Sequence, residues 1–244
     1  MSKKNIEPSN VEGACVDFVP FPSTPYLRVL GDGSVRGDKV MTPSQVDAFL
    51  RGTVIIEEKI DGANLGISFS AAGDVHLQNR GHRLLLPTTG QWHPLNEWLR
   101  WRRDALYADL KEQYILFGEW CYARHSIAYD ALPDWFIGFD IYDKKAGRFL
   151  SCALRDAFLE SLDIVRVPCL GRGQYDCDGL SGLMTQSHFG SSQAEGIYLR
   201  RDSNEWLEER AKLVHPDFLS SIDEHWSRKP LSRNRLQSEA TPSN

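Results

Sequence analysis

The sequence lacks the features of secreted, zinc-binding and membrane-spanning proteins. Its five cysteines are scattered, and no two have the CxxC spacing that is typical of a zinc site or a disulfide framework. No apolar run approaches the roughly 20 residues that span a bilayer. No apolar segment follows the lysines near the N-terminus, so we expect no signal peptide and no membrane contact. Such cysteine usage is typical of a reducing compartment, which predicts a cytoplasmic protein.

An excess of positive charge is also missing. The formal net charge is −5 over 244 residues, which argues against a surface coated in basic side chains for nucleic acid. A local basic groove is compatible with this total, because acidic residues gathered around a metal site would lower it. With 41% hydrophobic and 25% charged residues, the chain is long enough for one large domain or two small ones.

Segments that favour strands outnumber those that favour helices. Strands are predicted at 53–58, 64–70, 74–79, 114–120, 135–143, 163–170, 194–201 and 206–215. Helices are predicted at 42–52, 94–111 and 152–162. Antiparallel hairpins with a few covering helices are an α+β pattern. We expect residues 1–17 to be weakly ordered and 228–244 to be a disordered polar tail, so that 18–227 form the folded domain.

One of these strands ends in an unusual polar group. In TVIIEEKIDGANLGISFS, residues 53–70, Lys59 stands among three carboxylates and Gly62 follows. Taken alone, this pattern is typical of a solvated hairpin turn. Five further elements follow it in order on apolar strands: Asn79-Arg80-Gly81, Gly118-Glu119, Phe139-Asp140, Glu195-Gly196 and Arg210-Ala211-Lys212-Leu213. Six elements in order favour a reactive lysine over a surface turn.

The order of these elements resembles the covalent nucleotidyltransferase superfamily of polynucleotide ligases and mRNA capping enzymes. The likeness is strongest to RNA ligases of the phage T4 RNA ligase 2 type, and it covers roughly residues 50–220. It implies a nucleotidyltransferase (ATP-grasp-like) fold, in which antiparallel sheets are flanked by helices and bind the nucleotide between them. It also implies an ATP-dependent RNA ligase that joins 5′-phosphate and 3′-hydroxyl RNA ends through a covalent lysyl–AMP intermediate, in RNA repair.

The resemblance implies that Lys59 is the nucleophile and that Lys212, with Arg210, grips the α-phosphate. A lysine must be neutral to attack, which costs roughly 4–5 kcal/mol at pH 7 for a pKa of about 10.4. Carboxylates alone increase this cost, because they stabilise the ammonium. A divalent cation reverses the effect, so we expect Mg²⁺ (or Mn²⁺) at Glu195 and Glu119.

The residues that the resemblance implies for nucleotide binding are Glu58, Lys59, Asp61, Gly62, Asn64, Arg80, Glu119, Phe139 and Lys212. Arg80 would contact ribose and phosphate, and Glu58 is a candidate for accepting from the adenine amino group. Phe139 would stack on the purine, although its alternation with apolar neighbours is also typical of a core aromatic. Period-two geometry predicts that Asp140 points to the opposite face from Phe139.

Arg124 and His125 follow the Glu119 strand closely and are candidates for binding RNA, either its terminal phosphate or its backbone. Arginines 100, 102 and 103 are more typical of a solvated helix face. Only 32 residues follow Lys212 (244 − 212), too few for the OB-fold barrel of DNA ligases and capping enzymes. We therefore expect a minimal domain in which a partner protein could replace a missing C-terminal domain. The alternatives are a DNA nick ligase, a GTP-dependent capping-type enzyme, and an inactive nucleotide- or RNA-binding module.

Overall fold

The computed structural model describes residues 18–31, 39–220 and 231–239. The segment 1–17, expected to be weakly ordered, lies outside these residues. Within them, every helix is too short or too polar to span a bilayer.

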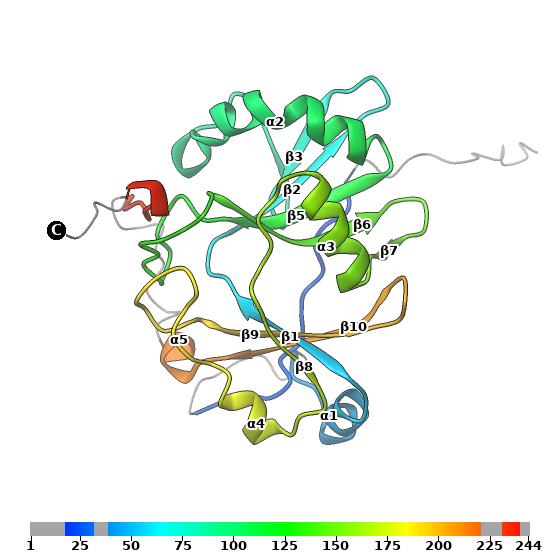
Figure 1. Cartoon of the computed structure of the whole chain (residues 1–244), viewed down its shortest axis with the longest axis vertical. Coiled ribbons are helices and arrows are strands. Elements are labelled where there is room, and N and C mark those ends of the chain that lie inside the picture. Colours follow the sequence, from blue (N-terminus) through cyan, green and yellow to red (C-terminus); the bar gives the residue numbers. More distant parts are fainter. Residues whose placement is uncertain (1–17, 32–38, 221–230, 240–244) are drawn as a thin grey trace, which may run out of the picture.

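Two antiparallel sheets face one another (Figure 1). The four-stranded sheet has the order β10 (Leu207–Val214), β9 (Gly196–Asp202), β1 (Val54–Lys59) and β8 (Cys169–Gly173). The six-stranded sheet has the order β4 (Arg83–Leu84), β3 (Val75–Gln78), β2 (Ala63–Phe69), β5 (Tyr114–Trp120), β6 (Phe136–Asp143) and β7 (Arg148–Phe149). All of the pairings within the two sheets are antiparallel, as expected from the hairpin-rich sequence.

Helices cover the outer faces of both sheets (Figure 1). On the six-stranded side lie α2 (Leu95–Leu110) and α3 (Cys152–Ser161), and on the four-stranded side lie α1 (Pro43–Leu50) and α4 (Cys177–Ser181). The chain also forms α5 (Pro216–Ser220) and the short 3₁₀ helices η2 (Gly90–Trp92) and η4 (Gln237–Glu239). The expected α+β arrangement, with antiparallel sheets between helices, is confirmed.

Local sequence explains where the helices lie. Helix α1 begins after Thr42, whose side chain accepts from the backbone of Gln45 while the Gln45 side chain accepts from the Thr42 backbone. This capping box satisfies two backbone donors that a helix start leaves open. Helix α2 buries Trp98 and Leu106 against the six-stranded sheet, and Arg100 is 70% exposed in its side chain, as expected for a solvated face.

The strand expected at 163–170 lies further along the chain, as β8. Asp163 has a left-handed backbone (φ 52°), and the backbone of Val165 and Val167 bonds to Gly138 of β6. Pro168 has no N–H to give to a neighbouring strand, although its carbonyl accepts from Glu58 N at 2.9 Å. The apolar pattern predicted a strand here, and the proline delays it.

The chain passes from one sheet to the other within four residues. Lys59 ends β1 in the four-stranded sheet, and Ala63 begins β2 in the six-stranded sheet. Figure 1 shows this passage in cyan at the left of the two sheets. The sequence that resembled a hairpin turn is therefore the connection between the sheets, and it brings Lys59 to the space between them.

Part of the expected disordered tail has a defined place. Residues 231–239 run along residues 121–132, with bridges at Ala123–Arg233 and Leu132–Leu236. Asn234 is 2% exposed. The polar composition of the tail gave no indication of this contact, because much of the contact is made by the single buried amide of Asn234. Residues 228–230 and 240–244 of the expected tail lie outside the described part of the chain.

Candidate active site

A cavity of about 260 Å³ lies between the two sheets. Eight residues expected at a nucleotide or metal site line it: Glu58, Lys59, Asn64, Arg80, Glu119, Phe139, Glu195 and Lys212. They come from both sheets and the segments next to them, so the site exists because the two sheets face one another. Arg80 lies at the turn after β3, where the Asn79 side chain accepts from the backbone of Gly81 and His82 and fixes the turn.

Lys59 is held by one carboxylate at the floor of the cavity. Its register in β1 pairs it with Gly196 of β9, which brings the neighbouring Glu195 to it, and Lys59 Nζ lies 2.5 Å from Glu195 Oε2. Burial would lower the pKa of Lys59, but Glu195, with Glu119 and Asp61, raises it above its ordinary value. These acidic neighbours favour the ammonium form of Lys59, so a nucleophilic role requires another positive charge nearby.

The described residues of the cavity lining include one carboxylate oxygen and one amide oxygen that are buried without a hydrogen-bond partner. They are Glu119 Oε2 and Asn64 Oδ1, on cross-strand neighbours of β2 and β5. Burial raises the pKa of Glu119 to about 8, against the opposing charge of Lys59. A cation or a hydroxyl donor would satisfy both oxygens, so the site suits a hard divalent cation or a ribose.

The described residues contain no group of three or more His, Cys, Asp or Glu side chains that could hold a metal by themselves. That is compatible with Mg²⁺, which usually binds one or two carboxylates together with substrate phosphates and waters. The predicted pair, Glu119 and Glu195, is of this kind.

Phe139 lines the cavity because β6 has a bulge. Phe117 pairs with Asp140 and Gly118 pairs with Gly138, which leaves Phe139 as the extra residue. Asp140 consequently points toward the other sheet too, where it binds Arg200 of β9 at 2.5 Å. The prediction that Asp140 points away from the Phe139 side is wrong, since the bulge breaks the period-two alternation on which it depended.

The side chains of Lys212 and Arg210 have different surroundings, although both residues lie on β10. Lys212 lines the cavity, and its Nζ lies 4.1 Å from the centre of the Tyr26 ring. Burial and the charge of Lys59 lower the pKa of Lys212 to about 8. Arg210 instead lies over the Phe149 ring at 4.2 Å and is 3.6 Å from Asp140 Oδ2. The structure does not bring Arg210 to the cavity.

Glu58 is 2% exposed and already receives three hydrogen bonds. Its carboxylate accepts from Ser187 Oγ at 2.5 Å, from His188 N at 3.0 Å and from His188 Nδ1 at 2.9 Å. Because a carboxylate has about four acceptor positions, one position stays open for a base amino group.

Asp61 and Gly62 do not line the cavity, but they fix the chain beside it. Asp61 Oδ2 accepts from Ser126 N at 2.7 Å and from Ile127 N at 2.8 Å. A Cβ on Gly62 would lie 2.9 Å from the carbonyl oxygen of Trp120, so only glycine fits without a shift. Asp61 thereby joins the lysine segment to the loop that carries the predicted RNA contacts.

Arg124 and His125, the predicted RNA contacts, also lie outside the cavity lining. The Arg124 side chain is exposed, and His125 is half-buried with Nε2 3.1 Å from Gln91 Oε1. Burial lowers the pKa of His125, against the charge of Asp61. Both residues lie within two positions of the backbone bound by Asp61.

The sequence comparisons agree with this geometry. Residues 52–214, about two thirds of the chain, match the RNA ligase family. The chain belongs to the RNA ligase family. A comparison with curated proteins finds no match.

Solved structures of an RNA ligase have the same fold as this family member. A mutant of the Naegleria gruberi RNA ligase with ATP and Mn has a TM-score of 0.60 at 14% identity, over 86% of this chain and 59% of that chain. The same ligase with PPi has a TM-score of 0.58 at 17% identity, over 84% and 64%. The expected nucleotidyltransferase fold is confirmed. The chain spans about three fifths of the length of these structures.

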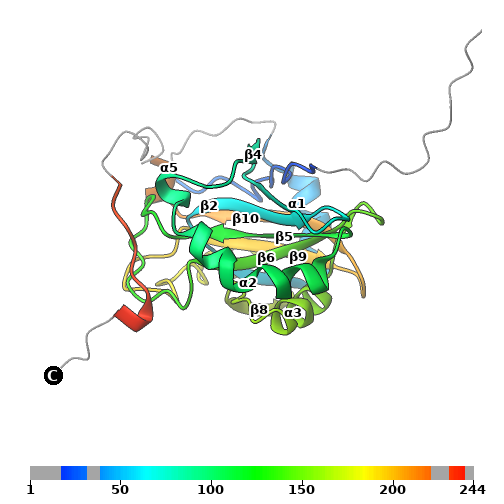
Figure 2. The same ribbon diagram turned by 90° about the horizontal axis from the view of Figure 1, so that it is seen from above.

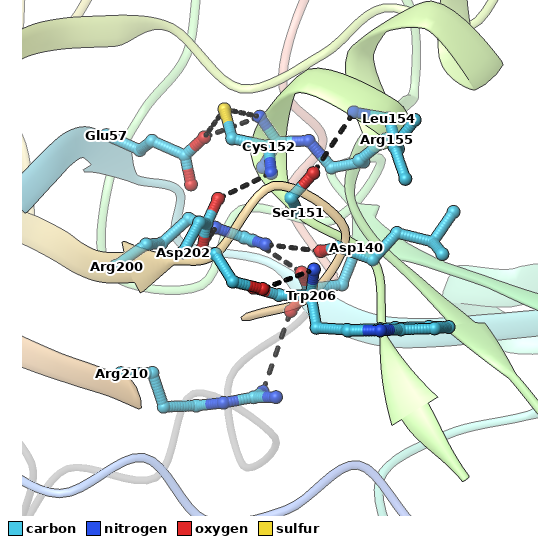
Figure 3. A network of polar contacts seen from close by, with 12 residues as sticks. Glu57, Asp140, Ser151, Cys152, Leu154, Arg155, Arg200, Asp202, Trp206 and Arg210 are labelled. Atoms are coloured by element: carbon cyan, nitrogen blue, oxygen red, sulfur yellow. Dashed lines mark hydrogen bonds and ion pairs between the residues drawn. The ribbon is translucent and has the colours of Figure 1, made fainter. Parts of the chain in front are cut away.

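This RNA ligase family member also has an ionic network that its sequence pattern did not indicate (Figure 3). Arg155 of α3 is 1% exposed; Nη2 lies 2.6 Å from Glu57 Oε1 of β1, and Nη1 donates to the Phe139 carbonyl at 2.8 Å. Arg200 of β9 donates to the same carbonyl at 3.4 Å. The network therefore ties both sheets to the backbone of Phe139.

Two aromatic residues of the N-terminal segment also contact site residues, and the sequence pattern did not indicate this. Phe21 packs edge-on against Phe139 with ring centres 5.2 Å apart, and Tyr26 lies under Lys212. Residues 25–27 bond to Lys212 through Lys212 N to Pro25 O and Leu27 N to Lys212 O. This proline-rich segment has neither helical nor strand periodicity, so its sequence pattern gave no indication of these positions.

Proposed function

We propose that this chain is an ATP-dependent RNA ligase that joins 5′-phosphate and 3′-hydroxyl RNA ends, with residues 18–227 as its adenylyltransferase domain. The observation that carries the proposal is the position of Lys59. Its amine lies in the cavity between the sheets, bound to Glu195, and Lys212 and the unsatisfied Glu119 oxygen line the same cavity. That set of groups suits nucleophilic attack on a bound phosphate.

The proposed chemistry has three steps. The Lys59 ammonium first gives up a proton to solvent. The neutral amine then attacks the α-phosphate of ATP, so that an N–P bond forms, the bond to pyrophosphate breaks and a second proton passes from the nitrogen to solvent. The AMP then passes to the 5′-phosphate of an RNA end, which frees Lys59. Finally the 3′-hydroxyl of a second end attacks the activated phosphate and AMP leaves.

The other residues of the cavity would bind and orient the nucleotide. Lys212 would neutralise charge that develops on the α-phosphate. Phe139 would stack on the adenine, Arg80 would contact ribose and phosphate, and the Glu119 carboxylate would accept from a ribose hydroxyl or face the metal. Glu58 would accept from the adenine amino group at its one open position.

Glu119 and Glu195 would hold Mg²⁺ or Mn²⁺ together with the nucleotide phosphates. The unsatisfied Glu119 oxygen and the raised pKa of Lys59, which a nucleophile must overcome, support this assignment. A bound cation would lower the pKa of the lysine and offset negative charge on the phosphates. One of the matched Naegleria structures contains ATP and Mn, and we propose that this chain binds the same kind of nucleotide and cation.

The biological setting is part of the proposal. We propose a role in RNA repair, in the reducing cytoplasm, which agrees with the free thiols of the four described cysteines. Because the matched Naegleria chains are longer, we also propose that a partner protein or a further domain assists end-joining.

The test is covalent labelling with α-³²P-labelled ATP or GTP, with Mg²⁺ or Mn²⁺, followed by a denaturing gel. We expect a label from ATP that is absent in Lys59→Ala, retained in Lys145→Ala as the matched exposed lysine, and removed by pyrophosphate. Labelling by GTP alone would favour capping-type chemistry. A folded protein that binds ATP without any label would be an inactive binding module. Transfer to 5′-phosphorylated RNA but not DNA would then separate RNA ligation from DNA nick sealing.

A further inference from the structure

We infer that residues 231–239, here called the C-terminal strap, form part of the surface that binds the RNA backbone. The strap fixes the 121–132 loop, which carries Arg124, and adds Arg235 beside it. This inference rests on the proposed RNA ligase function and names the residues outside the nucleotide cavity that would receive the RNA.

The strap is bound along its length as an extra, irregular strand. Arg124 N donates to Ser232 O at 2.8 Å, and Asn234 N donates to Tyr122 O at 2.9 Å. Further along, Arg235 N donates to Tyr129 O at 3.0 Å, and additional bonds join residue 132 to residues 235 and 237. Figures 1 and 2 show the strap in red beside the green loop that follows β5.

One side chain anchors the strap. Asn234 Oδ1 accepts from Tyr129 N at 2.9 Å, and Asn234 Nδ2 donates to the carbonyls of Cys121 at 2.8 Å and Ala123 at 3.3 Å. Because Asn234 is 2% exposed, these bonds are shielded from water and losing them leaves buried backbone groups unsatisfied. The Asn234 side chain therefore fixes the strap against the 121–132 loop.

The 121–132 loop is also bound by the active-site segment. Asp61 Oδ2 accepts from Ser126 N and Ile127 N, and Asp61 N donates to the Tyr129 hydroxyl at 2.8 Å. Asp61 is two residues from Lys59, so the loop is fixed relative to the nucleophile. Hydrogen bonds from the strap and from Asp61 therefore both fix the position of the loop.

The exposed side chains of this unit carry positive charge. Asn234 points inward, and its neighbours Arg233 and Arg235 are exposed, as alternation requires. Arg233 pairs with Glu239 at 2.9 Å and closes the end of the strap. The guanidinium groups of Arg124 and Arg235 form no ion pair with any described residue, so both are available to phosphates.

RNA is the partner that this surface fits best. The chain as a whole is acidic, with a net charge of −5. Nevertheless, Arg124 lies on a loop bound directly to the Lys59 segment, and Arg235 lies on the strap bound to that loop. Guanidinium forks suit phosphate oxygens, and contacts of this kind bind the backbone without reading its sequence. The surface would thus hold an RNA end near the nucleophile.

The test uses the full chain and a fluorescein-labelled, 5′-phosphorylated single-stranded RNA, with affinity measured by anisotropy between 50 and 300 mM KCl. Arg235→Gln and Arg124→Gln should each weaken binding several-fold and reduce the slope of log Kd against log salt by about 0.7, and the double variant by about twice that. Arg148→Gln, which removes an exposed arginine on β7, is the charge-matched control and should bind as wild type does.

Asn234→Ala tests the anchor, with exposed Ser238→Ala as its control in the same segment. We expect Asn234→Ala to weaken RNA binding and to lower the ratio of AMP transfer to Lys59 labelling, with Ser238→Ala unchanged. If Asn234→Ala does not fold by circular dichroism, the exposed Arg124 and Arg235 variants decide alone. Wild-type affinity and salt slope in both arginine variants would overturn the inference. Labelling of Lys59 in the same preparations keeps this result separate, because failure of the wild type to label contradicts the proposed function itself.

Discussion

Replacing Arg155 should test how the two sheets are held together. Arg155 and Glu57 are both about 1% exposed, and their closest atoms are 2.6 Å apart. In Arg155→Met the Glu57 carboxylate stays buried without its cation, which typically costs 3–5 kcal/mol. The Phe139 carbonyl also loses its donor at 2.8 Å and keeps only Arg200 at 3.4 Å, which adds about 1 kcal/mol. We expect a total of about 4–6 kcal/mol.

That loss is large against the 5–15 kcal/mol by which folded domains are usually stable. Urea unfolding, followed by circular dichroism and tryptophan fluorescence, would measure it by linear extrapolation. The double variant Arg155→Met/Glu57→Met removes both charges and should recover most of the loss, because apolar replacements of a buried pair are often neutral. The expected coupling energy from the double-mutant cycle is about 3 kcal/mol.

The exposed pair of Arg148 and Glu208, 2.7 Å apart and more than 40% exposed, provides the control. Arg148→Met should cost no more than about 1 kcal/mol, as is usual for surface pairs. The reasoning fails if Arg155→Met costs as little as that control. It fails equally if the double variant is as unstable as the single one, since the stability would then not come from the charge pair.

Three further predictions concern single positions. Phe139→Leu should raise the KM for ATP in Lys59 labelling about 5- to 160-fold, since stacking is worth about 1–3 kcal/mol per base. An unchanged KM would make Phe139 a core aromatic only. Gly62→Ala should lower both the melting temperature and the labelling rate, because the new Cβ would lie 2.9 Å from the Trp120 carbonyl oxygen. Gly81→Ala serves as the control, because a Cβ at that position has no atom within 4 Å. Thr42→Ala should lower the free energy of unfolding by about 0.5–2 kcal/mol through loss of the α1 cap, with labelling unaffected; a larger loss would contradict a purely local role.

Elements with a strong local pattern could be predicted closely. The helix expected at 152–162 is α3 at Cys152–Ser161, and the strand expected at 114–120 is β5 at those residues. Order along the chain also placed Lys59, Glu119 and Glu195 in one site, although 136 residues separate the first from the last. Ends of antiparallel strands from facing sheets can meet in space, so a motif spread over many strands can still form one cavity.

Features that depend on tertiary contacts could not be predicted in the same way. Arg155 and Arg200 are charged residues, and such residues are almost never fully buried without a partner; nothing local indicates that Glu57 and Asp140 supply those partners. The bulge at Phe139 depends on β5 as much as on β6. The strap depends on Asn234 finding three backbone groups more than 100 residues away. In each case the deciding partner is distant in sequence.

The segment Lys59–Gly62 differs most from the turn that its local sequence suggests. In a solvated hairpin these four residues would face water, yet Ile60 is 3% exposed and Lys59 lies inside the cavity. Crossing between two sheets gives each residue a separate contact: Lys59 with Glu195, Asp61 with the backbone of the 121–132 loop, and Gly62 with Trp120. Since those contacts reach both sheets and the loop, a change at any one residue should disturb the others. The polar interruption of strand-forming sequence is therefore explained by the contacts that meet there, and Glu195, with Glu119 and Asp61, favours the ammonium form of the buried Lys59.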